Sequence, residues 1–322
     1  MFCRFQSTEY FVNDSKNKSQ LWNDFKINFK KIYSDQNDEK IHREAFFDKI
    51  LLINNHNKVS IIGNESYYLN INHFTDYTLA DYQKMIGKSF IVPKHTNGKK
   101  LSYNIRNVNI PNEIDWRHYG AVSEIKNQGL CGSGWIFAAN AAIEAAWKGK
   151  TGILQSFSSQ AVADCTEGDS CTGGWVTKAF EYSKYYGMIN ETEYPYTYEG
   201  DDDCEISDKT VVGKISRWIH LQTNDEDYLK FYVGTIGPIV AGIDASLQTF
   251  QTYSYGIYDD PSCSETLNHV VLIIGYGKDD IYGDYWIAKN SYGSTWGEGG
   301  FFKIRRGLNR CGITLAVAAP IA

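Results

Sequence analysis

The sequence predicts an α+β protein, in which a helical N-terminal part precedes a larger unit with a helical first half and a β-rich second half. Apolar residues recur at helical spacing before residue 90, and a helix that is apolar nearly all round begins near Trp135. Short β-prone runs dominate after Val211. With 322 residues, 43% of them apolar and 15% aromatic, the chain is long enough for two or three compact units with large cores.

The net charge of −6 conceals two parts of opposite sign. Residues 1–110 carry a net charge of +5 and the remainder carries −11. The two parts should therefore attract each other, although a chance imbalance between two ordinary surfaces gives the same count. Neither part contains a concentrated basic block, which argues against a nucleic-acid partner. No apolar run approaches the about 18 residues of a membrane-spanning helix.

The N-terminal part is predicted to contain three helices. Residues 1–20 are polar and are expected to be disordered, without the apolar core of a secretory signal. The predicted helices extend from Leu21 to about Tyr33, from about Asn37 to Asn57, and from Thr78 to Ile86. Residues 68–76 are β-prone. Residues 87–109, with Pro93 and Gly98, are expected to form an extended linker.

Residues 128–140 combine a glycine-rich loop with the start of a buried helix. Gly129 and Gly132 indicate a tight turn, and the helix is predicted from Trp135 to about Lys148, ending at Gly149. The N-terminus of a helix carries free N–H groups and a positive dipole end. This loop is therefore a favourable place for an anion or a thiolate.

The remaining elements follow from capping residues and β-prone runs. Ser158 and Ser159 should cap a helix that leads to Cys165, and a further helix is predicted from Val176 to Tyr186. The adjacent Gly173 and Gly174 leave the backbone open to another chain. Strands are predicted at residues 239–243, 256–258, 269–276, 285–290 and 300–304.

The cysteines indicate disulfides and an oxidising compartment. Six of the seven cysteines lie after residue 110, which suggests three disulfides and one spare thiol. Zinc is the alternative use of clustered cysteines, but the sequence contains no Cys-x-x-Cys pair, and we expect no metal and no cofactor. Potential N-glycosylation sites occur at Asn13, Asn17, Asn64 and Asn190.

Two polar residues in the β-rich half are candidates for acid–base chemistry. His269 opens an apolar strand and is either a structural histidine or a base. Asn290 lies in a glycine-rich turn and is either a capping residue or an amide that fixes an imidazole tautomer. In the second case, Trp296 could shield the His–Asn hydrogen bond from water.

Taken together, these segments resemble the papain family of cysteine peptidases. The run Gln128-Gly129-Leu130-Cys131-Gly132-Ser133-Gly134-Trp135 is similar to the family's active-site segment, with Gly134 where the family has its catalytic cysteine. His269 and Asn290 follow in the family's order. The resemblance extends from about Trp22 to the end of the chain and includes a cathepsin L-like propeptide.

The resemblance implies a papain-like two-lobed fold preceded by a helical inhibitory propeptide. It places the propeptide domain at residues 21–90 and a linker that spans the cleft, in the reverse direction to a substrate, at 91–109. The peptidase domain then covers residues 110–322, with a left lobe at about 116–220 and a right lobe at about 221–318. Asn72, Phe74 and Asp76 fit the second propeptide motif. The first motif fits only in part, with Asp38, His42 and Lys49 at positions where the family has other residues.

The resemblance also implies a role for each residue of the site. Gln128 would be the oxyanion donor, His269 the base and Asn290 its orienting amide, and Gly173 and Gly174 would pair with the substrate backbone. The specificity pocket would be lined by Trp175, Gly242, Leu267 and Val270. The disulfides would be Cys131–Cys171, Cys165–Cys204 and Cys263–Cys311, leaving Cys3 free.

Gly134 has no side chain with which to attack a peptide bond. Loss of the nucleophile costs about 10⁶ in kcat in a subtilisin, and Ser133, one residue away, is wrongly placed to replace it. Without a thiolate, His269 should also lose that partner's upward pull on its pKa. The sequence thus predicts an inactive homologue, monomeric and secreted or lysosomal/endosomal, whose cleft binds peptides, inhibitors or its own propeptide.

Two alternatives remain open at this stage. One is an active lysosomal or digestive endopeptidase whose cysteine was replaced by mutation or sequence error. The other is a storage or structural protein with an idle cleft.

Overall fold

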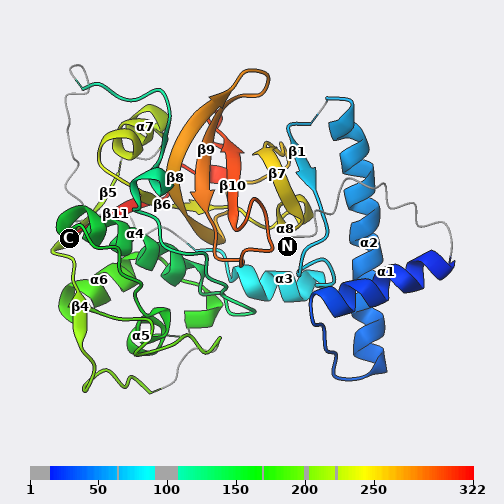
Figure 1. Ribbon diagram of the computed structural model, residues 1–322, viewed down its shortest axis with the longest axis horizontal. Helices are drawn as coiled ribbons and strands as arrows, with labels where there is room; N and C mark the ends of the chain where they lie inside the picture. The colour runs from blue at the N-terminus through cyan, green and yellow to red at the C-terminus, as the bar shows by residue number, and fades with distance from the viewer. Residues whose placement is uncertain (1–14, 64, 91–107, 169, 199–202, 222–223) are drawn as a thin grey trace.

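A nine-stranded sheet forms the centre of the structure, a computed structural model that describes residues 15–63, 65–90, 108–168, 170–198, 203–221 and 224–322 (Figure 1). The strand order is β1-β7-β10-β9-β8-β6-β11-β5, and β2 pairs with β8. Neighbouring strands are antiparallel except β7 and β10, which are parallel. The strands are β1 (Tyr67–Leu69), β2 (Ile114–Asp115), β5 (Arg217–His220), β6 (Ile239–Ile243), β7 (Tyr253–Tyr258), β8 (His269–Asp279), β9 (Gly283–Lys289), β10 (Phe301–Arg305) and β11 (Val317–Ile321).

The two faces of this sheet pack against two different hydrophobic cores. Alternate residues of a strand point to opposite faces. In β8, Val271 and Ile273 therefore belong to the core of the β-rich half, whereas Leu272 and Ile274 belong to the core around the central helix. This double burial explains why the strand is a continuous apolar run rather than an alternating one.

The central helix α4 (Gly134–Thr151) is buried from Gly134 to Ala145, as its apolar sequence predicts. It ends at Gly152 rather than at Gly149, because Gly152 adopts the left-handed conformation and its N–H caps the carbonyl of Lys148. Ser158 caps α5 (Ser159–Cys165), and α6 (Thr177–Tyr185) packs beside α4. A small ribbon of β3 (Met188–Ile189) and β4 (Val211–Gly213) completes this half.

The N-terminal part contains α1 (Ser15–Asn28), α2 (Gln36–Ile61) and α3 (Leu79–Ile86). Two predictions need correction here. Residues 15–20, predicted to be disordered, form the start of α1, and the same helix ends at Asn28 instead of Tyr33 because Lys30 takes a left-handed φ of 51°. Asp35 caps α2, which is longer at its C-terminal end than predicted.

Helices α1 and α2 cross and share a small core of their own (Figure 1). That core contains Trp22, Phe25, Phe46 and Ile50. Ion pairs at its edge, Lys26 with Glu39 and Lys31 with Asp76, lie within the N-terminal part.

The N-terminal part is joined to the main sheet rather than tethered loosely to it. Strand β1 pairs antiparallel with β7, and Phe74, Tyr82 and Met85 are buried in the same core as the β-rich half. The Asn72 side chain donates to the carbonyl of Gln251 at 2.9 Å, and the Gln251 side chain donates to that of Phe74 at 2.7 Å. These contacts are made by neutral groups, although the two parts differ in net charge.

The β-rich half also contains elements that the sequence analysis did not predict. Helix α7 (Glu226–Thr235) begins at Asp225, whose side chain accepts from the N–H of Tyr228, and α8 (Gln248–Gln251) is a single turn. Strands β5 and β11 pair with each other, so a lobe boundary at residue 220 falls inside the sheet. Short 3₁₀ helices occur at Trp116–Tyr119, Ser170–Thr172 and Arg310–Gly312.

Three disulfides fasten the loops of both halves. They join Cys131 to Cys171, Cys165 to Cys204, and Cys263 to Cys311. Cys3, Asn13, Asn64 and residues 91–107 lie outside the described residues. No helix within the described ranges combines the length and the hydrophobicity needed for a membrane crossing.

The shared core leads to a prediction about unfolding. Phe74 exposes 1% of its surface to solvent and packs on Tyr292 of the β-rich half at 5.3 Å between ring centres. Phe74→Ala should lower the free energy of unfolding by about 3–5 kcal/mol. Urea unfolding followed by fluorescence and circular dichroism should show one destabilised transition, since this residue belongs to both parts.

Ile32→Ala is the matched control, because Ile32 lies in the same N-terminal part and is 93% exposed. Its effect should stay within about 0.5 kcal/mol. Separate transitions for the two parts, with only the first one shifted by Phe74→Ala, would contradict a shared core.

Candidate active site

Gly134 is the first residue of α4 and faces the side chain of His269. A Cβ atom at this position would lie 2.5 Å from Cε1 and 2.7 Å from Nδ1 of His269, and 2.9 Å from Oε1 of Gln128. These separations are shorter than any van der Waals contact. The imidazole therefore lies in the space where a side chain at residue 134 would begin, and such a side chain requires the ring to move.

His269 is the first residue of β8 and is held on two sides. Its Nε2 lies 2.8 Å from Oδ1 of Asn290, an oxygen that can only accept, so Nε2 carries the proton and Nδ1 faces Gly134 as an acceptor. The ring of Tyr292 stacks on the imidazole at 4.8 Å. This arrangement fixes one tautomer, as expected for a base that is oriented by an amide.

Burial controls the protonation of His269. The side chain is 2% exposed, and the loss of hydration lowers its pKa from 6.5 to about 4, against the smaller upward effect of the Asn290 hydrogen bond. The imidazole is therefore neutral at pH 7. Because this lowering comes from burial, the further effect expected from the lack of a thiolate on the pKa of His269 stays a prediction.

Gln128 lies beside Gly134 and is fully buried. Its Nε2 donates to the carbonyl oxygens of Met85 at 2.8 Å and Cys131 at 2.9 Å, and its Oε1 accepts from Oγ of Ser291 at 2.6 Å. Met85 is part of α3. The amide assigned to the oxyanion is thus occupied by a backbone carbonyl of the N-terminal part.

Residues 87–90 continue from α3 between the two halves of the molecule. The N–H of Lys88 donates to the carbonyl of Thr172 on one side at 2.9 Å, and the N–H of Phe90 donates to the carbonyl of Leu267 on the other side at 3.0 Å. A Cβ at Gly87 would lie 3.2 Å from Cα of Gly173, so the two backbones approach each other closely. Gly173 has a φ of 107°, a conformation that favours glycine.

The side chain of Phe90 fills the predicted specificity pocket. Its ring stacks on Trp175 at 5.3 Å, and a Cβ at Gly242 would lie 3.1 Å from its Cζ and 3.0 Å from Leu267. Val270 belongs to the same hydrophobic cluster, but Gly174 packs against the ring of Trp135. The segment that lies in the cleft therefore begins at Met85, before the cleft-spanning linker predicted at residues 91–109, and the structure describes it as far as Phe90.

The aromatic cover of the site differs from the prediction. Tyr292, two residues after Asn290, stacks on His269, whereas Trp296 lies one ring farther away, against Tyr292 at 5.3 Å. The indole N–H of Trp296 donates to the carbonyl oxygens of Phe250 and Gln251. The assignment of Trp296 as the shield is corrected to Tyr292. Both aromatic residues follow Asn290 in the sequence, and spacing alone does not distinguish them.

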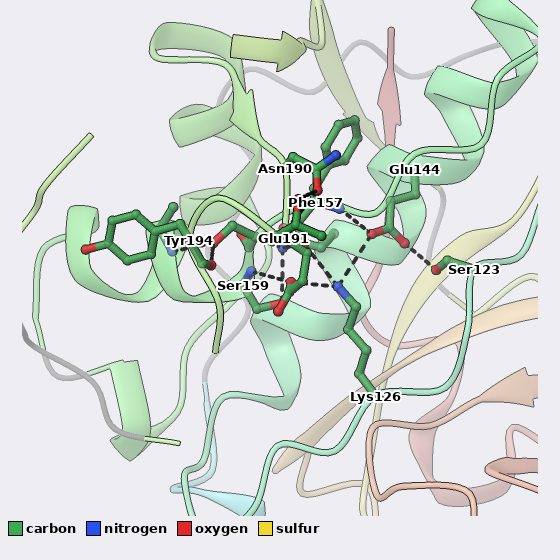
Figure 2. A network of polar contacts seen from close by, with 12 residues as sticks. Ser123, Lys126, Glu144, Phe157, Ser159, Asn190, Glu191 and Tyr194 are labelled. Carbon is green, nitrogen blue, oxygen red and sulfur yellow. Dashed lines mark hydrogen bonds and ion pairs between the residues drawn. The ribbon is translucent and has the colours of Figure 1, made fainter. Parts of the chain in front are cut away.

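A buried polar network lies behind the site and connects α4 to the loops beside it (Figure 2). Glu144 of α4 accepts from Oγ of Ser123 and from the N–H of Phe157, while Lys126 pairs with Glu191 at 2.8 Å. Nζ of Lys289 donates to the carbonyl and the hydroxyl of Ser123.

Lys289 links this network to the candidate base. It directly precedes Asn290, and burial lowers its pKa to about 8. The network therefore ties the residue that orients His269 to the helix that carries Gly134. The sequence analysis missed Lys289 and Glu144 because neither lies in a motif.

Comparison with known proteins gives the same fold and the same order of segments. Residues 110–321 match the family described as papain family cysteine protease, and residues 22–82 match the cathepsin propeptide inhibitor domain (I29). A cathepsin L-like protein of Caenorhabditis elegans is 37% identical over 323 residues, covering 96% of this chain and 95% of the relative. Cathepsin S of Rattus norvegicus is 38% identical, covering 89% of this chain and 88% of the relative.

The solved structures include proenzymes of the same layout. Digestive procathepsin L 3 from the larval midgut of Tenebrio molitor has a TM-score of 0.86 and 35% identity, covering 95% of this chain and 99% of that chain. The fold and the site therefore define a peptidase-type domain with its propeptide in the cleft. The chain belongs to the papain family of cysteine proteases, with cathepsin L-like homologues.

The buried imidazole gives a pH prediction. His269 binds a proton near pH 4 in the folded protein and near pH 6.5 when unfolded, so the unfolded state binds more protons between these values. Stability should therefore fall as the pH drops from 6.5 to 4, and this one group should account for roughly 3 kcal/mol of the loss. NMR should show the Cε1 proton of His269 titrating below pH 5.

His269→Gln is the comparison variant, since it removes the titrating ring. Its unfolding free energy should lose correspondingly less between pH 6.5 and 4. A His269 resonance that titrates at pH 6.5 or above would contradict the assignment.

Proposed function

We propose that this protein is a proteolytically inactive papain-family homologue that retains a peptide-binding cleft. The observation that carries the proposal is the pairing of Gly134 with His269. The position of the nucleophile has no side chain, and the base lies in the space that the nucleophile would need. Thiol peptidase chemistry needs a thiolate that attacks the carbonyl carbon and a base that removes its proton.

The neighbouring groups do not supply another nucleophile. The hydroxyl of Ser133 is hydrogen-bonded to that of Tyr196 at 2.8 Å, and Cys131 is in a disulfide with Cys171. The neutral His269 could still accept a proton at Nδ1, but a water in place of the thiol forms no acyl intermediate. We therefore expect binding without cleavage.

The contacts of residues 85–90 support the binding part of the proposal. The carbonyl of Met85 accepts a hydrogen bond from the side-chain amide of Gln128. The N–H groups of Lys88 and Phe90 donate to carbonyls on the two sides of the cleft, and the Phe90 ring fills the pocket beside Trp175. Each of these is a contact that an extended peptide could make. The first occupant of the cleft is thus the protein's own propeptide, and peptide ligands or inhibitors would have to displace it.

An active endopeptidase is the second candidate. It is favoured by the hydrogen bond between His269 and Asn290, which orients the imidazole as a base for thiol chemistry. On that account the natural residue at position 134 would be cysteine. In both cases the three disulfides favour a secreted or lysosomal protein, and we expect a monomer.

Restoring the thiol tests whether residue 134 alone accounts for the proposed inactivity. The wild-type chain, whose propeptide is removed at acid pH by an added aspartic peptidase, should not cleave a fluorogenic dipeptide substrate once that peptidase is inhibited. Gly134→Cys should cleave it at least about 10³-fold faster than wild type, and below the roughly 10⁶-fold that a nucleophile contributes, because the His269 ring must first move aside. A thiol-reactive epoxide should abolish this activity.

Gly134→Ala is the matched control, since it displaces the ring in the same way without adding a thiol. Its activity should equal that of wild type. Cleavage by the wild-type protein itself would overturn the proposal of inactivity, and no cleavage by Gly134→Cys would show that the site differs from an active one beyond residue 134.

The role of Phe90 can be tested on the intact chain. Phe90→Asp should remove the aromatic ring from the pocket and strengthen the binding of a labelled peptide by about 100-fold, because burial of such a ring contributes about 2–3 kcal/mol. Fluorescence anisotropy gives the dissociation constants. Lys88→Ala, which keeps the backbone N–H, should leave them unchanged; equal affinities for all three proteins would show that residue 90 does not control access.

A further inference from the structure

A second cavity lies at the far end of α4 from the candidate site. It has a volume of about 580 Å³, within the range of small-molecule pockets. Its lining comes from the 3₁₀ helix Trp116–Tyr119, the C-terminal turns of α4 and α7, and strands β5 and β11. Figure 1 shows these elements on the side of the molecule away from α1 and α2. In the described part of the chain, its lining residues all follow residue 115.

The wall of this cavity is apolar. Ile219 and Tyr232 are buried in its floor beside Pro238, and Tyr119 and Ile236 at its rim expose 64% and 44% of their surface. Large apolar side chains left in water around a concave surface indicate a ligand that covers them.

The polar part of the rim is cationic. Among the described residues, the charged side chains that line the cavity are those of Lys148, Lys150 and Arg217, none is Asp or Glu, and Ala322 also belongs to the lining. The two lysines complement the C-terminal end of α4, where a helix favours positive charge. Arg217 comes from β5 and lies at no helix end, so the helix dipole does not account for it. The residues after 110 carry a net charge of −11, so the cationic lining differs in sign from the part of the chain that contains it.

We propose that this cavity binds a small amphipathic anion, with an apolar ring or chain against Ile236 and Tyr119 and a carboxylate or sulfonate head at Arg217. Arg217 selects the charge of the head, since Nζ of Lys148 donates to the carbonyl of Gly152 and Nζ of Lys150 lies over the ring of Trp147. The apolar wall selects the body. Because the propeptide fills the cleft at the other end of α4, a ligand of the intact chain has to displace it there, whereas no such displacement is needed at this cavity. The proposal does not depend on whether the protein cleaves peptides.

The test is a titration of the full chain with 1-anilinonaphthalene-8-sulfonate, followed by fluorescence. Saturable binding of one dye per chain is expected. Arg217→Ala should weaken it about fivefold, the effect of one exposed ion pair, and Ile236→Asp should weaken it at least about tenfold. The controls are Lys278→Ala, which removes an exposed cation outside the cavity, and Ile281→Asp, which introduces the same carboxylate at an exposed isoleucine outside it; both should leave the affinity unchanged.

A neutral relative of the dye, N-phenyl-1-naphthylamine, tests the charge on the wild-type protein without any substitution. It should bind at least about fivefold more weakly than the sulfonate; equal affinity would overturn the proposed anionic head. Displacement of the dye by oleate supports a chain-like body, and displacement by naphthalene-2-sulfonate alone supports a ring. No displacement by either, or equal effects of Ile236→Asp and Ile281→Asp, would overturn the proposal.

Discussion

The contact between Gly134 and the His269 ring is the constraint on which the site depends. Since residue 134 has no Cβ, the imidazole lies against the start of α4, where burial keeps it neutral and Asn290 fixes its tautomer. A cysteine at this position would require the His269 ring to move, so replacing Gly134 changes more than one side chain of the site. The base and the missing nucleophile compete for one volume, so any side chain at residue 134 changes the position and the pKa of His269 together.

The second constraint is the shared core between the N-terminal part and the β-rich half. The opposite charges of the two parts suggested an electrostatic attraction, but the contacts described here are aromatic packing, a strand pairing and hydrogen bonds between neutral groups. Charged groups keep their hydration better at the surface, as Lys26 and Glu39 do. The net charge of a segment is therefore a poor guide to the contacts that hold it.

The sequence predicted best those features that follow from a hydrophobic pattern or from a motif shared with a family. The α+β class, the buried helix of residues 134–151 and strand β6 followed from hydrophobic patterning, and the disulfide pairing followed from family resemblance. It was least informative where a contact depends on three-dimensional packing. Tyr292 was overlooked as the ring on His269 because two aromatic residues follow Asn290, and spacing does not tell which one stacks. Phe90 lay in residues 87–109, which were assigned to an extended linker, since the short run Phe90-Ile91-Val92 carries no periodicity that indicates a buried side.

Strand β1 has a consequence for solubility. It is the outermost strand of the sheet and covers the backbone of β7, so removal of the N-terminal part would leave the N–H and C=O groups of β7 unpaired along an open edge. Such an edge is a template for pairing with another chain. On the proposed lack of catalysis, the chain would not cut its own propeptide, and the retained segment would protect the sheet against edge-to-edge aggregation.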